Sequence, residues 1–68
     1  MRIKSMVTDR YYEQERMVFI SNVAQIAKYM KHGAVLYDLL TDNECLIGVF
    51  SKIETKELYA KWNRRELT

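Results

Sequence analysis

Apolar residues along the chain switch between continuous runs and a helical spacing, and these switches predict the order of the secondary structure. Residues 18–20 (Val-Phe-Ile) form a short run of branched and aromatic side chains, which is typical of a buried strand. Two further apolar runs, residues 34–40 and 45–50, flank the polar residues 41–44. This pattern predicts an antiparallel hairpin with a four-residue polar turn. Gly48 inside the second run predicts either a bulge or a side chain that crosses closely over the backbone.

The segment between the first strand and the hairpin has the spacing of an amphipathic helix. Its apolar stripe consists of Val23, Ile26, Ala27 and Met30. Asn22 is a suitable N-cap, and Gln25 takes the position where a capping box has Glu or Gln. At the other end, Lys31 and His32 complement the negative end of the helix dipole, and Gly33 suits the left-handed conformation that often follows a helix. We therefore expect a helix that ends at residues 31–33.

A second helix is predicted after the hairpin. Ser51 and Glu54 have the spacing of a capping box at its start. Leu58 and Trp62 lie one turn apart and mark its inner face. From residue 18 onward the predicted order is therefore strand, helix, strand, strand, helix.

The first 17 residues allow two interpretations. Ile3, Ser5 and Val7 alternate with other residues as in a strand, and residues 11–17 would return as a second strand that continues into residues 18–20. The alternative is a short helix from Asp9 to Arg16 with Asp9 as its cap. We expect the strand pair.

These elements predict one α+β domain over residues 1–68. Residues 1–17 form an N-terminal strand pair or extension, and residues 18–68 form a β-α-β-β-α core. Two helices should cover one face of a small, mostly antiparallel sheet of about three to four strands. The predicted core consists of Ile20, Val23, Ile26, Ala27, Met30, Val35, Leu39, Ile47, Val49, Leu58 and Trp62.

Composition limits how so short a chain can be stabilised. With 68 residues and one cysteine, no intrachain disulfide can form, and a structural zinc site lacks its ligands. Since 49% of residues are apolar and eight are aromatic, we expect a homodimer that buries the surplus. No segment is long and apolar enough to cross a membrane, and no export signal is visible. A cytoplasmic location in a bacterial cell is the expectation.

Few residues are available for catalysis or metal binding. His32 is the only histidine and is explained by its place at a helix end, and Cys45 is expected to fill the core. The carboxylates are spaced like surface residues, and the isolated glycines Gly33 and Gly48 form no phosphate-binding loop. We therefore expect no enzyme and no cofactor.

Two surface segments remain as candidate binding sites. The first is a predicted protein interface in the N-terminal run, where Tyr, Arg and Met are the residue types enriched at interfaces. Its candidate residues are Arg10, Tyr11, Tyr12, Arg16 and Met17. The second is a basic C-terminal segment that would contact nucleic-acid phosphates through Lys61, Arg64 and Arg65, with Lys52 and Lys56 as further cations. The formal net charge of +2 permits an anionic partner without requiring one.

Residues 19–67 resemble a small uncharacterised domain family of Gram-positive bacteria (Firmicutes) and their phages. The resemblance is carried by residues 19–22 (Phe-Ile-Ser-Asn) leading into residues 24–30 (Ala-Gln-Ile-Ala-Lys-Tyr-Met), by Gly33, by Val49-Phe50 and by residues 54–58 (Glu-Thr-Lys-Glu-Leu) followed by Trp62. It brings no catalytic residue with it. It implies mainly that the chain is similar to short, stand-alone phage accessory proteins. Together with the small size, the missing catalytic chemistry and the surplus of aromatic residues, it predicts a phage-encoded, non-enzymatic interaction protein that binds and inhibits or redirects a host protein, with a bacterial defence system as the expected target. The alternative is a small nucleic-acid-binding regulator.

Overall fold

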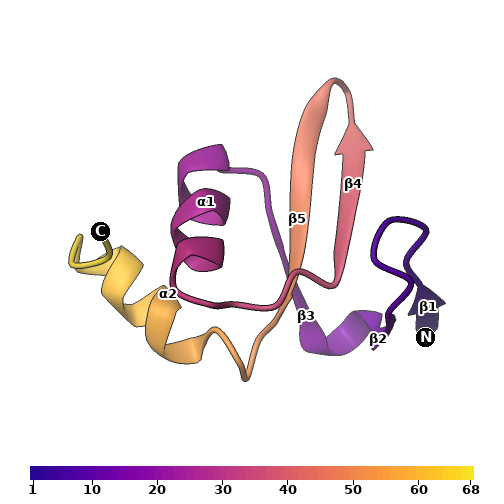
Figure 1. Ribbon diagram of the computed structural model, residues 1–68, viewed down its shortest axis with the longest axis horizontal. Helices are drawn as coiled ribbons and strands as arrows, with labels where there is room; N and C mark the ends of the chain where they lie inside the picture. Colours follow the sequence, from indigo (N-terminus) through magenta and orange to yellow (C-terminus); the bar gives the residue numbers. More distant parts are fainter.

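The computed structural model describes residues 1–68 and shows a small α+β fold, as predicted. In chain order its elements are β1 (Arg2–Lys4), β2 (Tyr11–Glu13), the 3-10 turn η1 (Gln14–Arg16), β3 (Met17–Ile20), α1 (Val23–Lys31), β4 (Asp38–Asp42), β5 (Cys45–Ser51) and α2 (Lys56–Asn63) (Figure 1).

The strands form two antiparallel sheets instead of the single sheet that we expected. One sheet contains β1 and β2, and the other has the order β3-β5-β4. The predicted N-terminal strand pair is confirmed and the helix from Asp9 to Arg16 is wrong, because only the single turn η1 is helical there. This turn also interrupts the long second strand that we expected. The β1–β2 hairpin consequently packs across the larger sheet and does not extend it.

Each face of the larger sheet is covered by a different part of the chain. The cluster on one face joins β3 and β5 to α1 and to the C-terminal segment, and consists of Ile20, Ile26, Tyr29, Phe50 and Leu67. Leu58 and Trp62 of α2 pack against this cluster. The cluster on the other face joins Tyr12 of β2 to Met17 and Val49. Side chains alternate along a strand, so Phe50 and Val49 face opposite ways. We call the two sides the helix face and the hairpin face.

The start and the end of α1 are as predicted, but its buried side is not. The Asn22 side chain accepts a hydrogen bond from the Gln25 amide at 3.2 Å, and Gly33 has a φ of +86°. Gln25, Ile26 and Tyr29 are the buried residues of α1. The helix is thus turned by roughly one residue, about 100°, relative to the apolar stripe. The reason is that the large ring of Tyr29 packs edge-on against Phe50, with ring centroids 5.4 Å apart.

Several predicted core residues are therefore placed differently. Val23, Ala27 and Met30 are exposed. Half-buried positions are occupied by Val35, Leu39, Ile47, Leu58 and Trp62. Ile20, Ile26 and Val49 are buried as predicted, and the prediction omitted Tyr12, Met17, Tyr29, Phe50 and Leu67.

The β4–β5 hairpin has a tighter turn than expected. Asp42 pairs with Cys45, so only Asn43 and Glu44 form the turn, and both have positive φ, 47° and 67°. Such left-handed pairs match the twist of two-residue hairpins. The tip projects beyond the rest of the molecule (Figure 1). Cys45 is exposed at this tip, so its predicted place in the core is wrong.

Helix α2 begins later than the predicted capping box. The Ser51 hydroxyl does accept a hydrogen bond from the Glu54 amide, at 3.4 Å, but residues 51–55 form a turn and the helix starts at Lys56. Thr55 closes this turn by donating its hydroxyl to the Ser51 carbonyl at 2.7 Å. The turn is what brings α2 back to the helix face.

Gly48 is required because α1 packs directly over it. A Cβ atom at this position would lie 3.1 Å from Cγ1 of Ile26 and 3.1 Å from a ring carbon of Phe50. The pairing of β5 continues through Gly48 on both sides, so the close-packing alternative is confirmed and the bulge is not present.

We expect Gly48→Val to lower the free energy of unfolding by about 1–3 kcal/mol through overpacking. Urea titration measures this loss, and Leu46→Val on the exposed part of the same strand is the control, with less than ~0.5 kcal/mol expected. Equal effects of the two substitutions would contradict the close contact.

Candidate functional site

The largest hollow on the molecule, with a volume of about 610 Å³, follows the outer edge of β3. Its floor is formed by residues 18–22, which run from the edge strand β3 to the N-cap of α1. One wall comes from Gln25 and Tyr29 of α1. The other comes from the turn before α2 and from α2 itself, through Lys52, Thr55, Lys56 and Tyr59. We call this hollow the β3 groove.

The backbone on the floor of the β3 groove has free hydrogen-bonding groups. In the ladder to β5, the amide of Lys52 donates to the carbonyl of Arg16 at 3.0 Å. Because hydrogen-bonded positions alternate in an antiparallel ladder, the backbone amide and carbonyl groups of Val18 and Ile20 also point toward β5. The amide and carbonyl groups of Phe19 and Ser21 therefore point to the open edge.

The walls of the β3 groove combine aromatic surface with positive charge. Phe19 is 45% exposed and Tyr59 is 56% exposed, although both are large apolar side chains. Lys52 and Lys56 are the only charged residues among the eleven that line the groove, and neither forms an ion pair. The lining of the groove therefore carries two positive charges and no carboxylate.

The deeper polar groups of the groove are already paired. The Gln25 side-chain amide donates to the Tyr29 hydroxyl at 3.1 Å, so Gln25 does not form the second half of a capping box. The Thr55 hydroxyl is bound to the Ser51 carbonyl. No buried side-chain nitrogen or oxygen atom anywhere in the chain lacks a partner. These groups hold the walls in place, and the backbone edge and the two lysines remain available for a ligand.

The N-terminal candidate interface is divided by the fold. Tyr12 and Met17, at 6% exposure each, belong to the core on the hairpin face and form no part of the surface. Arg10, Tyr11 and Arg16 are exposed. The ring of Tyr11 lies under the guanidinium of Arg2, 4.5 Å from the ring centroid. Alternation along β2, which exposes Tyr11 and buries Tyr12, is the signal that separates the two residues.

The C-terminal cations are also separated. Arg65 lines a second hollow of about 510 Å³ together with Lys28, Trp62, Asn63 and Leu67. The Lys28 ammonium lies 5.3 Å from the centroid of the Trp62 ring and therefore occupies one face of this ring. Arg64 is paired with Glu66 at 2.8 Å. Lys61 is exposed but does not line this hollow.

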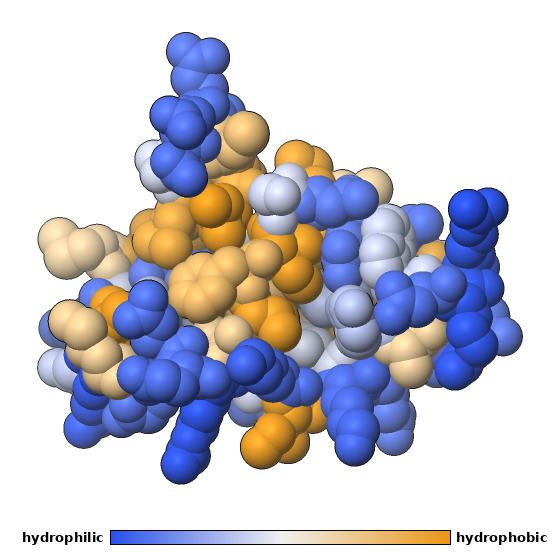
Figure 2. Space-filling model, turned by 180° about the vertical axis from the view of Figure 1, so that it is seen from behind, coloured by the Kyte–Doolittle hydropathy of each residue, from blue (hydrophilic) through white to orange (hydrophobic).

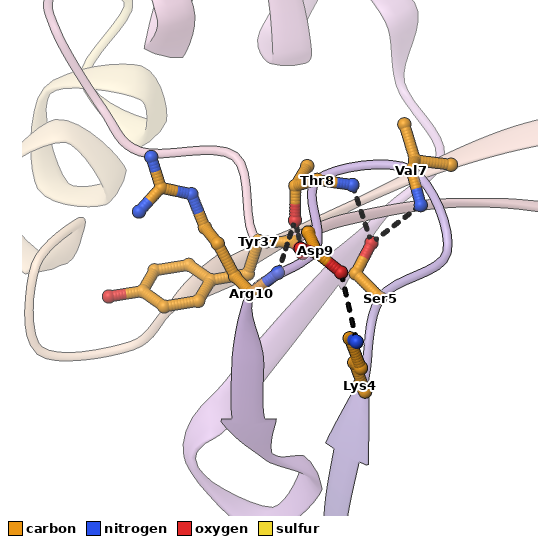
Figure 3. A network of polar contacts seen from close by, with 7 residues as sticks. All are labelled: Lys4, Ser5, Val7, Thr8, Asp9, Arg10 and Tyr37. Carbon is orange, nitrogen blue, oxygen red and sulfur yellow. Dashed lines mark hydrogen bonds and ion pairs between the residues drawn. The ribbon is translucent and has the colours of Figure 1, made fainter.

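A buried carboxylate lies between β4 and the N-terminal hairpin. Asp38, 4% exposed, accepts hydrogen bonds from the Ser5 hydroxyl (2.7 Å), the Tyr12 hydroxyl (2.8 Å) and the Leu39 amide (2.8 Å). The Ser5 oxygen in turn accepts from the amides of Val7 and Thr8 (Figure 3). None of the three side chains Ser5, Tyr12 and Asp38 lines a hollow. We assign this network the structural role of fastening the hairpin to the sheet.

The same network makes stability depend on pH at both ends of the scale. Burial alone would raise the pKa of Asp38, but the hydrogen bonds from Ser5, Tyr12 and Leu39 lower it below its ordinary value. Stability from this carboxylate is therefore present above the unfolded pKa and is lost as the pH falls through the folded pKa. Burial, followed by the bond to Asp38, raises the pKa of Tyr12 to about 12.

We expect the urea midpoint to fall in acid below about pH 4 and again in alkali above about pH 10, the ordinary pKa of tyrosine. The stability from neutral Tyr12 is present below pH 10 and is lost as the pH rises through the folded value. Tyr12→Phe should reduce the alkaline decline. It should not abolish it, because a hydrogen bond to Glu54 raises the pKa of Tyr37 as well. An alkaline decline unchanged in Tyr12→Phe would contradict the assignment.

The remaining reactive side chains have no partners suited to chemistry. The His32 ring bonds the carbonyl of Thr68 at 2.7 Å, and its backbone ends α1. No three His, Cys, Asp or Glu side chains are grouped as metal ligands. None of the helices has the length and apolar character needed to cross a membrane.

The chain matched no family model, no curated protein and no solved structure in comparisons with known proteins. The sequence did not predict the β3 groove, since Phe19 is far along the chain from Lys52 and Tyr59. No local pattern signalled it, because the edge position of β3 depends on which strands pair.

Proposed function

We propose that this chain is a non-enzymatic interaction protein that binds another protein through the β3 groove. The observation that carries this proposal is the coincidence of an unpaired strand edge with two exposed aromatic side chains, Phe19 and Tyr59. Proteins usually protect exposed edges with proline, bulges or inward-pointing charges, because a free edge pairs readily with other chains. β3 has neither a proline nor a bulge. An unprotected edge in an open groove is typical of a binding surface for polypeptide.

The kind of partner is proposed from the resemblance of residues 19–67 to the phage and Gram-positive domain family. On this basis the protein is phage-encoded, acts in the bacterial cytoplasm, and inhibits or redirects a host protein, with a defence system as the expected target. The small size of the chain suits this mode of action. In this proposal the protein acts by occupying a surface of its partner through the β3 groove.

Photo-crosslinking in a Gram-positive host tests the proposal and compares the two candidate interfaces. A photoreactive phenylalanine analogue replaces Tyr59 in the groove or Tyr11 on β2, which are matched in residue type and in exposure, at 56% and 54%. We expect a discrete protein adduct from position 59 and none from position 11. An adduct from position 11 alone would move the interface to the N-terminal hairpin. Absence of both adducts, with nucleic acid co-purifying, would contradict the proposal.

We further propose a homodimer, formed through the part of the hairpin face that the β1–β2 hairpin leaves open. Cys45 is exposed on this side, and Leu40 and Ile47 are half-buried beside it. Apolar side chains gather at the base of the projecting hairpin tip (Figure 2). We expect light scattering at about 50 µM to give twice the chain mass, and Cys45→Lys to give a monomer with unchanged circular dichroism. A wild-type monomer would contradict this prediction.

Binding of nucleic acid is the second candidate function. It is supported by the hollow beside Trp62, which is lined by Lys28 and Arg65 and by no carboxylate. If it is correct, affinity for single-stranded DNA should fall steeply between about 50 and 200 mM salt, and Lys28→Ala with Arg65→Ala should weaken it further. Arg16→Ala, an exposed cation outside the hollow, is the control. Binding that does not depend on salt would exclude this function.

A further inference from the structure

We propose that the β3 groove takes an extended segment of the partner in which acidic and apolar residues alternate, and that this segment adds a strand to the β3-β5-β4 sheet. The proposal rests on the protein-binding function above and specifies the chemistry of the partner. It makes β3, now an edge, an inner strand of a four-stranded sheet.

The backbone supports an added strand at β3, whereas the other edge of the sheet is partly obstructed. Phe19 and Ser21 present amide and carbonyl groups outward, two residues apart, which is the repeat that a neighbouring strand requires. The opposite edge, β4, is obstructed at its start. There Thr8 donates its hydroxyl to the Tyr37 carbonyl at 2.6 Å, and the loop from Ser5 to Arg10 lies over this position (Figure 3).

Charge determines which segment fits. Lys52 and Lys56 line the groove without a carboxylate, and the only polar contact of the Lys52 ammonium is the Glu15 carbonyl at 3.3 Å. Both lysines come from the α2 side of the sheet, the helix face. Side chains of an added strand alternate between faces, so every second one would meet these ammonium groups and the others would lie beside the Phe19 ring. Acidic residues therefore fit the positions that face the two lysines, and apolar residues fit the positions that face the Phe19 ring.

Charge also disfavours a second copy of this chain as the occupant. Two β3 strands paired about a two-fold axis would lie about 4.8 Å apart. The lysine pairs of both copies would then share one groove with no carboxylate in its lining. The ammonium groups of the two copies would repel each other, whereas a partner with acidic residues is attracted.

Peptide selection against the intact chain tests the proposal. The probe is a displayed library of random peptides of about ten residues, the upper length of ordinary strands. We expect enriched peptides with acidic residues at alternate positions. Titrating the best peptide into isotopically labelled protein should shift the amide resonances of Phe19 and Ser21 most. N-methylation of the peptide at every second amide should abolish binding in one register and spare it in the other.

Two sets of variants separate backbone pairing from side-chain contact. Phe19→Pro removes the outward amide, whereas Phe19→Ala keeps the amide and removes the ring. We expect Phe19→Pro to bind the peptide at least about tenfold more weakly than Phe19→Ala, because the lost hydrogen bond and the blocked edge act together. Lys52→Glu with Lys56→Glu should reverse the selection toward basic peptides.

Three results would overturn the inference. The first is that the enriched peptides lack acidic residues, and the second is that they bind as helices. The third is that the Phe19 and Ser21 amides are already shielded in a dimer of the chain without peptide. If the Tyr59 crosslink still forms in cells in any of these cases, the protein-binding function stands and only the strand-addition mode fails. If no crosslink forms at all, the function itself fails.

Discussion

Phe50→Ala is expected to leave about half of the protein or more unfolded at 25 °C. Phe50 is completely buried, contacts the edge of the Tyr29 ring, and lies at the centre of the cluster that joins the sheet to both helices. Truncating a buried phenylalanine to alanine costs about 3–5 kcal/mol, through lost transfer energy and the cavity left behind. A core in a chain of this size supplies only about 3–5 kcal/mol of net stability. The loss therefore equals the whole margin.

Phe19→Ala is the matched control, since it makes the same chemical change on the neighbouring strand at a side chain that is 45% exposed. We expect it to cost about 1 kcal/mol or less, because only part of the burial energy is lost. Urea titrations at one protein concentration, followed by Trp62 fluorescence and by circular dichroism, measure both variants. If Phe50→Ala and Phe19→Ala had similar midpoints, the cluster on the helix face would not be the main core.

Asp38→Ala is expected to have the second largest effect, about 3 kcal/mol of lost stability. The carboxylate accepts three hydrogen bonds, from the Ser5 and Tyr12 hydroxyls and from the Leu39 amide. Leaving a buried donor without its acceptor costs about 1–3 kcal/mol for each group that water cannot reach. The N-terminal hairpin should detach first, because these bonds fasten it to the sheet. Hydrogen exchange of the Tyr12 amide would report this.

Asp42→Ala is the control for Asp38→Ala, since Asp42 is exposed four residues further along the same strand. Less than about 0.5 kcal/mol is expected there. A double-mutant cycle with Tyr12→Phe then measures the bond itself. Tyr12→Phe should destabilise the wild type more than it destabilises Asp38→Ala. Additive effects would show that Asp38 contributes through packing and not through its hydrogen bond to Tyr12.

Local chemistry explains why the elements could be predicted. The Asn22 cap, the left-handed Gly33 and the apolar runs of the hairpin act over a few residues, so the sequence carries them directly. Alternation and spacing likewise predicted that Leu58 and Trp62 would face inward. The N-terminal strand pair could be predicted because Ile3 and the residues around it alternate.

Prediction failed where the result depends on which side of an element meets another. The stripe of α1 suggested Val23 and Met30 for the core, but the helix is turned so that Tyr29 meets Phe50. Cys45 looked like a core residue because it begins an apolar run, yet the hairpin extends past its cover. Tyr12 looked like an interface residue because it is aromatic, yet Asp38 provides a buried partner for its hydroxyl.

The sequence by itself thus determined the α+β class, the two helices and the antiparallel hairpins, because caps, glycines and hydrophobic spacing act between near neighbours in the chain. Only the tertiary structure decided that β3 would be an edge and that Lys52, Lys56 and Tyr59 would line its groove. That outcome depends on how the sheet pairs and on the turn at residues 51–55, which bring together residues more than thirty positions apart. Contacts between distant residues are set by the packing of whole surfaces, which no local pattern in the chain records.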